Sequence, residues 1–386
     1  MKYMVIGAGG IGSTVAADLA HCSETSTIGV ADINLEAAQQ VAQSLGSKAT
    51  AYKVDIYDAQ GLVDAIEGYD VVLNLAGPYY QTAGPVLEAC MAAKVNYIDV
   101  ADDASAVVKL LGYDDACREA GITALVAFGA SPGLSNVLCM LGAVKMDEVD
   151  EIYTLWVQSV LEDTTGAASI WHGLEMVSGT VPQFLDGELK NVPAISGATK
   201  VDFGGLMGEW PVYYVGHPEP VTLPTYVKGV KKVVNMGNLW PADADLVSLF
   251  GPYRDLGLCG TDTLRVGAAE VSKRDFACAN IVDLFDKALA ANTDDGELEE
   301  AGTHLRIEVI GRTGGFPDHI SYSISGKTKN LTGWSASFAA QALAAGKIDS
   351  KGLFPPEVLE NRDALLQYLG ERGVRVIETK TETRTL

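Results

Sequence analysis

The chain is 386 residues long, which is enough for two domains that each bury a hydrophobic core. Hydrophobic residues make up 48% of it and charged residues 20%, a balance typical of folded proteins and not of disordered ones. The formal net charge is -22, so a nucleic-acid backbone or an anionic membrane surface would be repelled over most of the surface. We therefore expect no nucleic acid and no membrane among the partners.

Signals for export, disulfides and metals are weak. The first apolar run is short and interrupted by glycines, unlike a secretory signal, and no stretch approaches the roughly 20 apolar residues of a membrane span. The histidines are widely separated, and no paired-cysteine spacing suggests a metal site. We expect a cytoplasmic protein without a metal, in which six reduced cysteines are small buried residues: Cys22, Cys90, Cys117, Cys139, Cys259 and Cys278.

Residues 1–135 alternate between strand-like and helix-like segments. Between the strand-like segments lie segments whose apolar residues have helical spacing, and several of these segments end at a glycine. This alternation predicts an α/β fold, a Rossmann-type doubly wound parallel sheet. The six apolar, β-branched runs that we expect to be its strands are 2–7, 25–32, 49–56, 70–77, 96–101 and 122–129.

The run GAGGIG lies between the first strand and the first helix, which is the context that gives a GxGxxG pattern its meaning. Gly7 permits the tight turn, Gly9 lets the backbone approach a pyrophosphate, and Gly12 lets the helix pack closely on the strand. The helix N-terminus then offers free N–H groups to the phosphates, with Gly10 and Ile11 in its first turn. The alternative is a structural turn without a ligand.

Asp32 bears on the choice of dinucleotide. It ends the second strand, 20 residues after Gly12, where its carboxylate can accept hydrogen bonds from both ribose hydroxyls. A 2′-phosphate would meet a negative charge there, and the following residues INLEAA bring no Arg or Lys to neutralise it. We expect NAD, with NADP the less favoured cofactor; a helix N-cap is the alternative role for Asp32.

Further cofactor contacts follow from the rule that ligands lie at the carboxyl ends of parallel strands. Asp55 and Ile56 end the third predicted strand and are expected beside the adenine. The residues that end the fourth are expected to face the nicotinamide ribose and the pyrophosphate: Asn74, Ala76, Gly77 and Pro78.

Two stretches carry a resemblance to a known family. The segments NLAGPYYQTAGPVLEACMAAKVNYIDVADD (74–103) and FGASPGLSNVLCMLGA (128–143) resemble the saccharopine dehydrogenase family, which includes saccharopine reductases and lysine 6-dehydrogenases. Segments 216–233 and 331–359 look similar too, in the same order. The resemblance implies a dinucleotide-binding domain, a middle α+β domain with substrate contacts, and a C-terminal segment that returns to the first domain.

The rest of the chain fits this plan. Strand-like alternation at 151–160, 211–215, 305–311 and 319–326 predicts a mostly antiparallel sheet, and 374–382 an edge strand. The domains are thus expected at 1–135 (dinucleotide binding), 136–330 (substrate binding and dimerisation, α+β) and 331–386 (C-terminal helices). Because an exposed sheet face or edge is commonly covered by a second subunit, we expect a homodimer.

Oxidation of an amine by hydride transfer requires a base, since an ammonium has no lone pair to expel the hydride. Tyr80 follows the fourth strand and Asp102 the fifth, both in the family-like stretch. His217 lies in the loop GHPEP with Glu219 beside it. We assign these three residues as catalytic candidates; the alternatives are loop packing for Tyr80, a helix cap for Asp102 and a backbone hydrogen bond for His217.

The leading functional hypothesis is an NAD-dependent amino-acid dehydrogenase similar to lysine 6-dehydrogenase, which forms an imine and hydrolyses it. A saccharopine-type reductase acting on a secondary amine is the alternative within the fold, and a non-catalytic dinucleotide sensor is the alternative of another class. The middle domain offers few arginines, which favours a less anionic amino-acid substrate than saccharopine.

Overall fold

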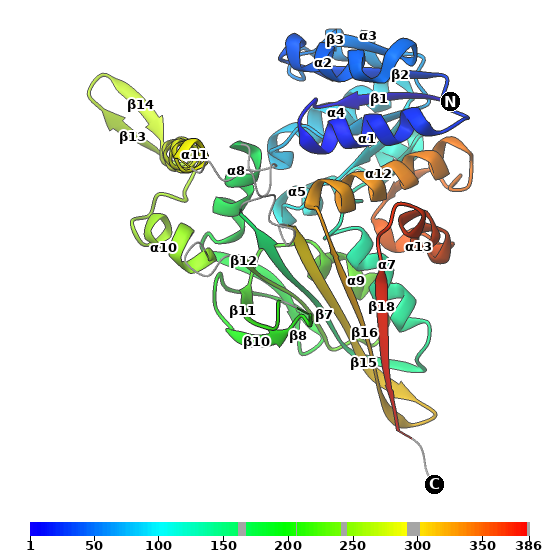
Figure 1. The fold of residues 1–386 in the computed structure, drawn as a ribbon, viewed down its shortest axis with the longest axis vertical. Coiled ribbons are helices and arrows are strands. Elements are labelled where there is room, and N and C mark those ends of the chain that lie inside the picture. Colours follow the sequence, from blue (N-terminus) through cyan, green and yellow to red (C-terminus); the bar gives the residue numbers. More distant parts are fainter. Residues whose placement is uncertain (161–166, 206, 241–244, 292–301, 384–386) are drawn as a thin grey trace. The chain divides into compact units, whose positions relative to one another are not determined.

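The computed structural model describes residues 1–386 except 161–166, 206, 241–244, 292–301 and 384–386 (Figure 1). Its internal contacts divide the chain into two units, each assembled from separate stretches of sequence. The first unit comprises residues 1–146, 225–227 and 328–376. The second comprises residues 147–224, 228–327 and 377–386.

The first unit contains the predicted parallel sheet. It has seven strands in the order β17-β6-β5-β4-β1-β2-β3, and every pair is parallel. The six predicted strands are confirmed as β1 (Lys2–Ile6), β2 (Thr27–Asp32), β3 (Ala49–Lys53), β4 (Val71–Asn74), β5 (Asn96–Asp99) and β6 (Thr123–Leu125). The seventh, β17 (Gly352–Phe354), comes from the C-terminal segment, in a stretch for which we expected no strand. Three residues are too few to give a readable period.

Helices flank this sheet: α1 (Gly10–His21), α2 (Leu35–Leu45), α3 (Ala59–Ile66), α4 (Tyr79–Ala93), α5 (Ala104–Leu111), α6 (Asp114–Ala120), α7 (Leu134–Ala143), α12 (Thr328–Ala344) and α13 (Arg362–Glu371). A 3₁₀ turn, η3 (Pro356–Val358), follows β17 in the C-terminal segment. Helix α4 begins at Tyr79 and continues through Pro85. Apart from Ala89, its buried positions form one stripe at helical spacing: 79, 82, 83, 86, 87 and 90.

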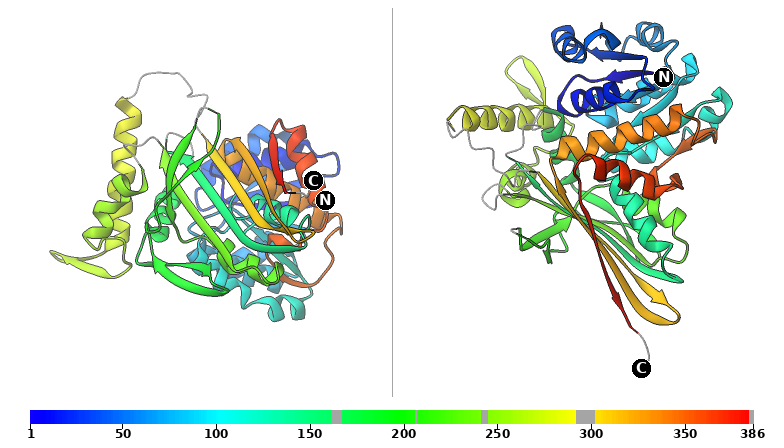
Figure 2. Two further views of the ribbon diagram at one scale, coloured as in Figure 1. Left: turned by 90° about the horizontal axis from the view of Figure 1, so that it is seen from below. Right: turned by 45° about the vertical axis from the view of Figure 1, so that its right-hand side comes forward.

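Helix α12, from the C-terminal segment, runs alongside α1 (Figures 1 and 2). Gly333 permits the close approach, since a Cβ there would lie 2.9 Å from the Thr14 Cγ2 atom on α1. A buried polar cluster joins the same helices to α13. Arg372 Nε donates to Asp18 Oδ1 at 2.6 Å, and the Ser337 and Tyr368 hydroxyls both donate to Asp18 Oδ2.

The second unit is built on a nine-stranded sheet. Seven strands follow the order β10-β11-β12-β7-β15-β16-β18; β8 pairs with β12, and β9 pairs with β8. The strands are β7 (Glu148–Ser159), β8 (Thr180–Leu185), β9 (Glu188–Pro193), β10 (Thr199–Asp202), β11 (Glu209–Tyr214), β12 (Lys232–Trp240), β15 (Thr303–Thr313), β16 (Phe316–Gly326) and β18 (Val376–Glu382). The mostly antiparallel sheet is confirmed, with one parallel pair, β7 and β12. As expected, β18 is an edge strand, beside β16 (Figure 2).

Helices and a small hairpin complete the second unit: α8 (Ala167–Met176), α9 (Glu219–Tyr226), α10 (Leu246–Asp255), α11 (Lys273–Ala291), β13 (Thr263–Val266) and β14 (Ala269–Ser272). The residues of α9 in this unit are 219–224. A two-residue turn joins β15 to β16, and both of its glycines, Gly314 and Gly315, have positive φ, as such hairpins require. Among the described residues, no helix combines the length and the apolar character that crossing a membrane requires.

The Asp18 cluster yields a test of the first unit. We expect Asp18→Asn to lower the free energy of unfolding by about 2 kcal/mol, because it weakens three contacts that join α1, α12 and α13. Urea unfolding measures this. The control is Asp283→Asn, which removes an exposed pair with Lys287 and should have an effect below about 1 kcal/mol. Equal effects of the two substitutions would contradict the assignment.

Candidate functional site

The glycine turn between β1 and α1 has the geometry that a dinucleotide needs. Gly7 has φ +104°, and a Cβ on Gly12 would lie 1.8 Å from the Gly7 carbonyl oxygen, so a side chain is excluded at both positions. A Cβ on Gly9 would meet nothing within 4 Å, which leaves the backbone open to a ligand. Helix α1 starts at Gly10, and the N–H groups of its first turn have no partner within the helix. These residues therefore fit a pyrophosphate.

Asp32 is held beside this turn at the end of β2. Its Oδ2 accepts the Ala8 N–H at 2.8 Å, and its Oδ1 accepts the Asn34 N–H at 2.8 Å. The alternative role as a helix cap is wrong, because Asn34 caps α2 by accepting from the N–H groups of Glu36 and Ala37. Each carboxylate oxygen keeps lone pairs for a ribose hydroxyl. The carboxylate is thus fixed in place before a cofactor arrives.

Lys53 is a residue that reading along the chain missed. It stands in register with Asp32 on the adjoining parallel strand β3, and its side chain is exposed. Side chains in register on parallel strands point to the same face. Residues 33–38, which follow Asp32 in the sequence, contain no Arg or Lys, whereas Lys53 comes beside Asp32 only by strand pairing.

The expected adenine and ribose contacts occupy the same sheet edge. Asp55 and Ile56 lie in the loop after β3, where Asp55 Oδ1 accepts the Tyr57 N–H at 2.9 Å. Ala76, Gly77 and Pro78 follow β4 and are half-buried. Asn74 is fully buried: its Nδ2 donates to the Tyr97 hydroxyl at 3.3 Å. Asn74 is therefore part of the framework that holds the edge.

Asp99 is the centre of that framework. Its Oδ1 accepts the N–H groups of Ala101 at 3.0 Å and Ala127 at 2.6 Å, and its Oδ2 accepts the Tyr97 hydroxyl at 2.8 Å. The carboxyl is fully buried, and this burial raises its pKa to about 6 although the three hydrogen bonds oppose the shift. The network joins the carboxyl ends of β4, β5 and β6, where a nicotinamide is expected.

The catalytic candidates of the first unit lie close to Asp99 in the chain. Tyr80 is half-buried in the first turn of α4, and its hydroxyl accepts from Gln81 Nε2 at 3.2 Å. Its neighbour Tyr79 is buried, and the burial, followed by the charge of Asp102, raises the pKa of Tyr79 well above its usual range. Tyr79 therefore lies within electrostatic reach of Asp102, which is half-buried in the loop after β5. Asp103 occupies the N-cap position of α5 without a capping side-chain hydrogen bond.

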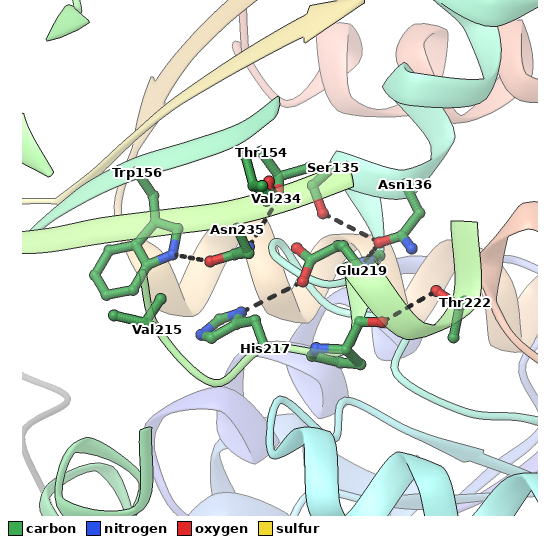
Figure 3. Close-up of polar contacts among 12 residues, drawn as sticks. Ser135, Asn136, Thr154, Trp156, Val215, His217, Glu219, Thr222, Val234 and Asn235 are labelled. Carbon is green, nitrogen blue, oxygen red and sulfur yellow. Dashed lines mark hydrogen bonds and ion pairs between the residues drawn. The ribbon is translucent and has the colours of Figure 1, made fainter. Parts of the chain in front are cut away.

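His217 lies in the second unit, in the loop between β11 and α9 (Figure 3). Its Nδ1 is 3.6 Å from Glu219 Oε2, and 6% of the His217 side chain and 0% of the Glu219 side chain are exposed. The Trp156 ring centroid is 5.6 Å from that of His217, and the His172 ring, edge-on, is 5.3 Å away. His217 is therefore part of a buried histidine–glutamate cluster, which we define as Trp156, His172, His217 and Glu219.

Polar groups of the sheet hold this cluster in place. Trp156 Nε1 donates to Asn235 Oδ1 at 2.9 Å, and Asn235 Nδ2 donates to Thr154 Oγ1 at 2.9 Å (Figure 3). A Cβ on Gly237 would lie 2.1 Å from the Trp156 ring, so the indole lies flat across β12 only because residue 237 is glycine. The sequence placed Glu219 beside His217, but Trp156 and Asn235 came together through the parallel pairing of β7 with β12.

The fold and the glycine turn define the class of the first unit: a Rossmann-type domain for a nicotinamide dinucleotide. The comparisons extend this to a family. Residues 3–125 match the family described as the saccharopine dehydrogenase NADP binding domain. The resemblance read from the sequence is thus confirmed for these residues.

Relatives and solved structures agree with this placement. The carboxynorspermidine synthase of Vibrio cholerae serotype O1 is 26% identical over 299 residues, 71% of this chain and 70% of that protein. The carboxyaminopropylagmatine dehydrogenase of a Synechocystis species is 31% identical over 145 residues, 35% of this chain and 36% of that protein.

Two solved structures show the same fold over nearly the whole chain. The saccharopine dehydrogenase (L-Glu forming) of Saccharomyces cerevisiae has a TM-score of 0.70 at 15% identity and covers 99% of this chain and 100% of that one. The homospermidine synthase of Legionella pneumophila, solved in complex with NAD, has a TM-score of 0.63 at 12% identity and covers 98% of this chain and 91% of that one.

The Asp32 geometry predicts an effect on cofactor binding. We expect Asp32→Ala to weaken NADH binding about tenfold or more, because hydrogen bonds to a carboxylate are lost, and to weaken NADPH binding less. Fluorescence titration of both cofactors measures the two dissociation constants. Lys53→Ala is the companion variant, since it changes the charge opposite Asp32 without touching the carboxylate. An unchanged NADH-to-NADPH ratio in Asp32→Ala would refute the role.

The Asp99 shift predicts a dependence of stability on pH. The folded protein holds this proton more tightly than the unfolded chain, so the contribution of Asp99 to stability is fully present below about pH 4 and falls by on the order of 3 kcal/mol as pH rises to about 6. In Asp99→Asn the amide oxygen still accepts both N–H groups, and we expect this fall to be absent. Denaturant unfolding from pH 4 to 7 measures it, with Asp115→Asn, whose side chain is 97% exposed, as the control. A fall of wild-type size in Asp99→Asn would count against the shift.

Proposed function

We propose that the chain is an NAD(P)-dependent oxidoreductase that acts on a C–N bond of an amine-bearing substrate. The observation that carries the proposal is the glycine turn with its fixed Asp32, which fits a dinucleotide within a domain of the saccharopine dehydrogenase type. The names of the relatives support the substrate class, since carboxynorspermidine and carboxyaminopropylagmatine are both carboxylated polyamines with a secondary amine. The favoured reaction is accordingly the reduction of an imine to a secondary amine, or its reverse.

Charge in the second unit supports a cationic substrate with few carboxylates. The unit has five arginines between residues 147 and 327, and its own acceptors engage each of them. The partners are Asp255 for Arg254, the Gly267 carbonyl for Arg265, Glu175 and the Cys259 carbonyl for Arg274, Glu308 for Arg306, and Asp150 for Arg312. Saccharopine, with three carboxylates, would need such cations, whereas a polyamine suits a chain of net charge -22.

The bound cofactor supplies the hydride acceptor or donor. The protein's part is to orient the substrate and to move one proton at its nitrogen, because only a free amine has the lone pair that expels a hydride. Tyr80 and Asp102 of the first unit and His217 of the second are the residues that we propose for this proton. Of the two cofactors, NAD is proposed as the preferred one, because Asp32 presents a carboxylate where NADP carries its phosphate.

Oxidative deamination of a primary amine, as in lysine 6-dehydrogenase, is the second candidate. The engaged arginines support it equally, since lysine carries one carboxylate and two amines. It differs in its products, because hydrolysis of the imine releases ammonia.

A substrate panel tests the proposal. The purified protein with NAD or NADP is offered a carboxylated polyamine, saccharopine and lysine, and both the reduced cofactor and ammonia are measured. We expect the carboxylated polyamine to give the highest kcat/KM without ammonia. The control is Gly12→Ala, which closes the cofactor turn and should abolish turnover of every substrate.

The other outcomes each have a meaning. Turnover of lysine with stoichiometric ammonia would replace the secondary-amine reaction with the deaminating one. Tight NADH binding without turnover of any amine would contradict both the secondary-amine reaction and the deaminating reaction, and would favour a dinucleotide sensor.

A further inference from the structure

We propose that Glu219 is a positioning residue that orients His217 for proton transfer. The inference rests on the proposed function, in which His217 handles a proton at the substrate nitrogen. Glu219 acts through the imidazole ring: its carboxylate holds a proton on Nδ1, and the lone pair of Nε2 is then the atom that exchanges a proton with the substrate.

The two groups are placed for this role by the start of α9. Glu219 is the first residue of that helix, and Pro218 separates it from His217. The Nδ1 to Oε2 distance is 3.6 Å, about half an ångström longer than a hydrogen bond, so a small rotation of either side chain closes it. The other ring nitrogen points away from Glu219 (Figure 3).

Burial strengthens the electrostatic interaction between His217 and Glu219. With 6% and 0% of their side chains exposed, His217 and Glu219 meet where water screens little. A buried carboxylate only accepts hydrogen bonds, so it favours the tautomer of His217 with the proton on Nδ1 and stabilises the imidazolium when Nε2 gains a proton. A glutamine in its place both donates and accepts, and therefore specifies no tautomer.

The surrounding residues fix the rest of the ring's freedom. Trp156 lies at an interplanar angle of 36° to His217, and His172 meets it at 69°. The backbone is pinned as well: Gln183 Nε2 donates to the Val215 carbonyl at 3.0 Å, and the Gly216 N–H donates to the Met176 carbonyl at 3.2 Å. These contacts therefore fix the loop and the ring plane. Glu219 then determines which ring nitrogen of His217 carries the proton.

The kinetic test is a double-mutant cycle on amine oxidation. We expect His217→Gln to lower kcat about a hundredfold, Glu219→Gln to lower it about tenfold with the KM for the nicotinamide cofactor unchanged, and the double variant to be no worse than His217→Gln. A purely structural Glu219 would instead give additive losses, about a thousandfold in the double variant, and that result would overturn the inference.

The second readout does not depend on activity. Long-range ¹H–¹⁵N spectra report which nitrogen of His217 carries the proton, and the chain has five histidines, so the resonance is assigned by its loss in His217→Gln. We expect the Nδ1–H tautomer in the wild type and a mixture in Glu219→Gln. The control is Glu175→Gln, which removes the carboxylate partner of Arg274 in the same unit and should leave the His217 signals unchanged.

The two readouts separate the two proposals. Absence of turnover with every amine, together with a Glu219-dependent tautomer, would reject the proposed function and keep the positioning role. Turnover with an additive cycle, or identical His217 signals in wild type and Glu219→Gln, would reject the positioning role and keep the proposed function.

Discussion

The arrangement of the first unit depends on one contact, between the start of α1 and the turn that precedes it. Because a Cβ on Gly12 would come within 1.8 Å of the Gly7 carbonyl oxygen, the helix lies at a distance that only glycine allows. That distance aims the N–H groups of the helix at the carboxyl edge of the sheet, where Asp32 is tied to the same turn through Ala8. The C-terminal segment also packs on α1. Gly333 lets α12 approach α1 closely, and the hydrogen bonds of Asp18 link α1 to α13. The cofactor geometry is thus supported by residues more than three hundred positions away in the chain.

A second constraint is the buried carboxyl of Asp99. Burial of this carboxyl raises its pKa to about 6. Its oxygens nevertheless accept three hydrogen bonds, from the Ala101 and Ala127 N–H groups and from the Tyr97 hydroxyl, and these bonds hold the loops after β5 and β6. Ala127 has φ +62°, a strained value for a residue with a side chain, and its N–H is the one that reaches Asp99 at 2.6 Å. Strain and a buried charge at the same sheet edge are features that structural packing alone rarely keeps, and they occur where a parallel sheet places its ligand.

The sequence predicted most of the first unit, because long apolar runs alternating with amphipathic helices have a clear period. What it could not supply were features made by pairing between distant segments. Strand β17 has three residues and no period, and Lys53 stands beside Asp32 only through the register of β2 with β3. In the second unit, the short strands β8 to β10 and the parallel pairing of β7 with β12 were not predicted. His217 and Glu219 are two residues apart and could be noted from the sequence, but Trp156 joins them because its register partner is Gly237.

The two units differ in the charged and polar groups that they could offer to a ligand. The first unit offers backbone N–H groups at a helix terminus, which suit the phosphates of a dinucleotide without arginine or lysine side chains in the turn. The second unit engages the arginines between residues 147 and 327 with its own acceptors, and it buries Glu219 beside His217, whose ring lies next to that of Trp156. For the amine substrate that we propose, the engaged arginines would offer little attraction to a polyanion, while carboxylates and aromatic faces suit an ammonium group. Under the proposed function, selectivity for an amine would follow from the charges that the second unit neutralises internally, and the reaction at the C–N bond would follow from the nicotinamide cofactor.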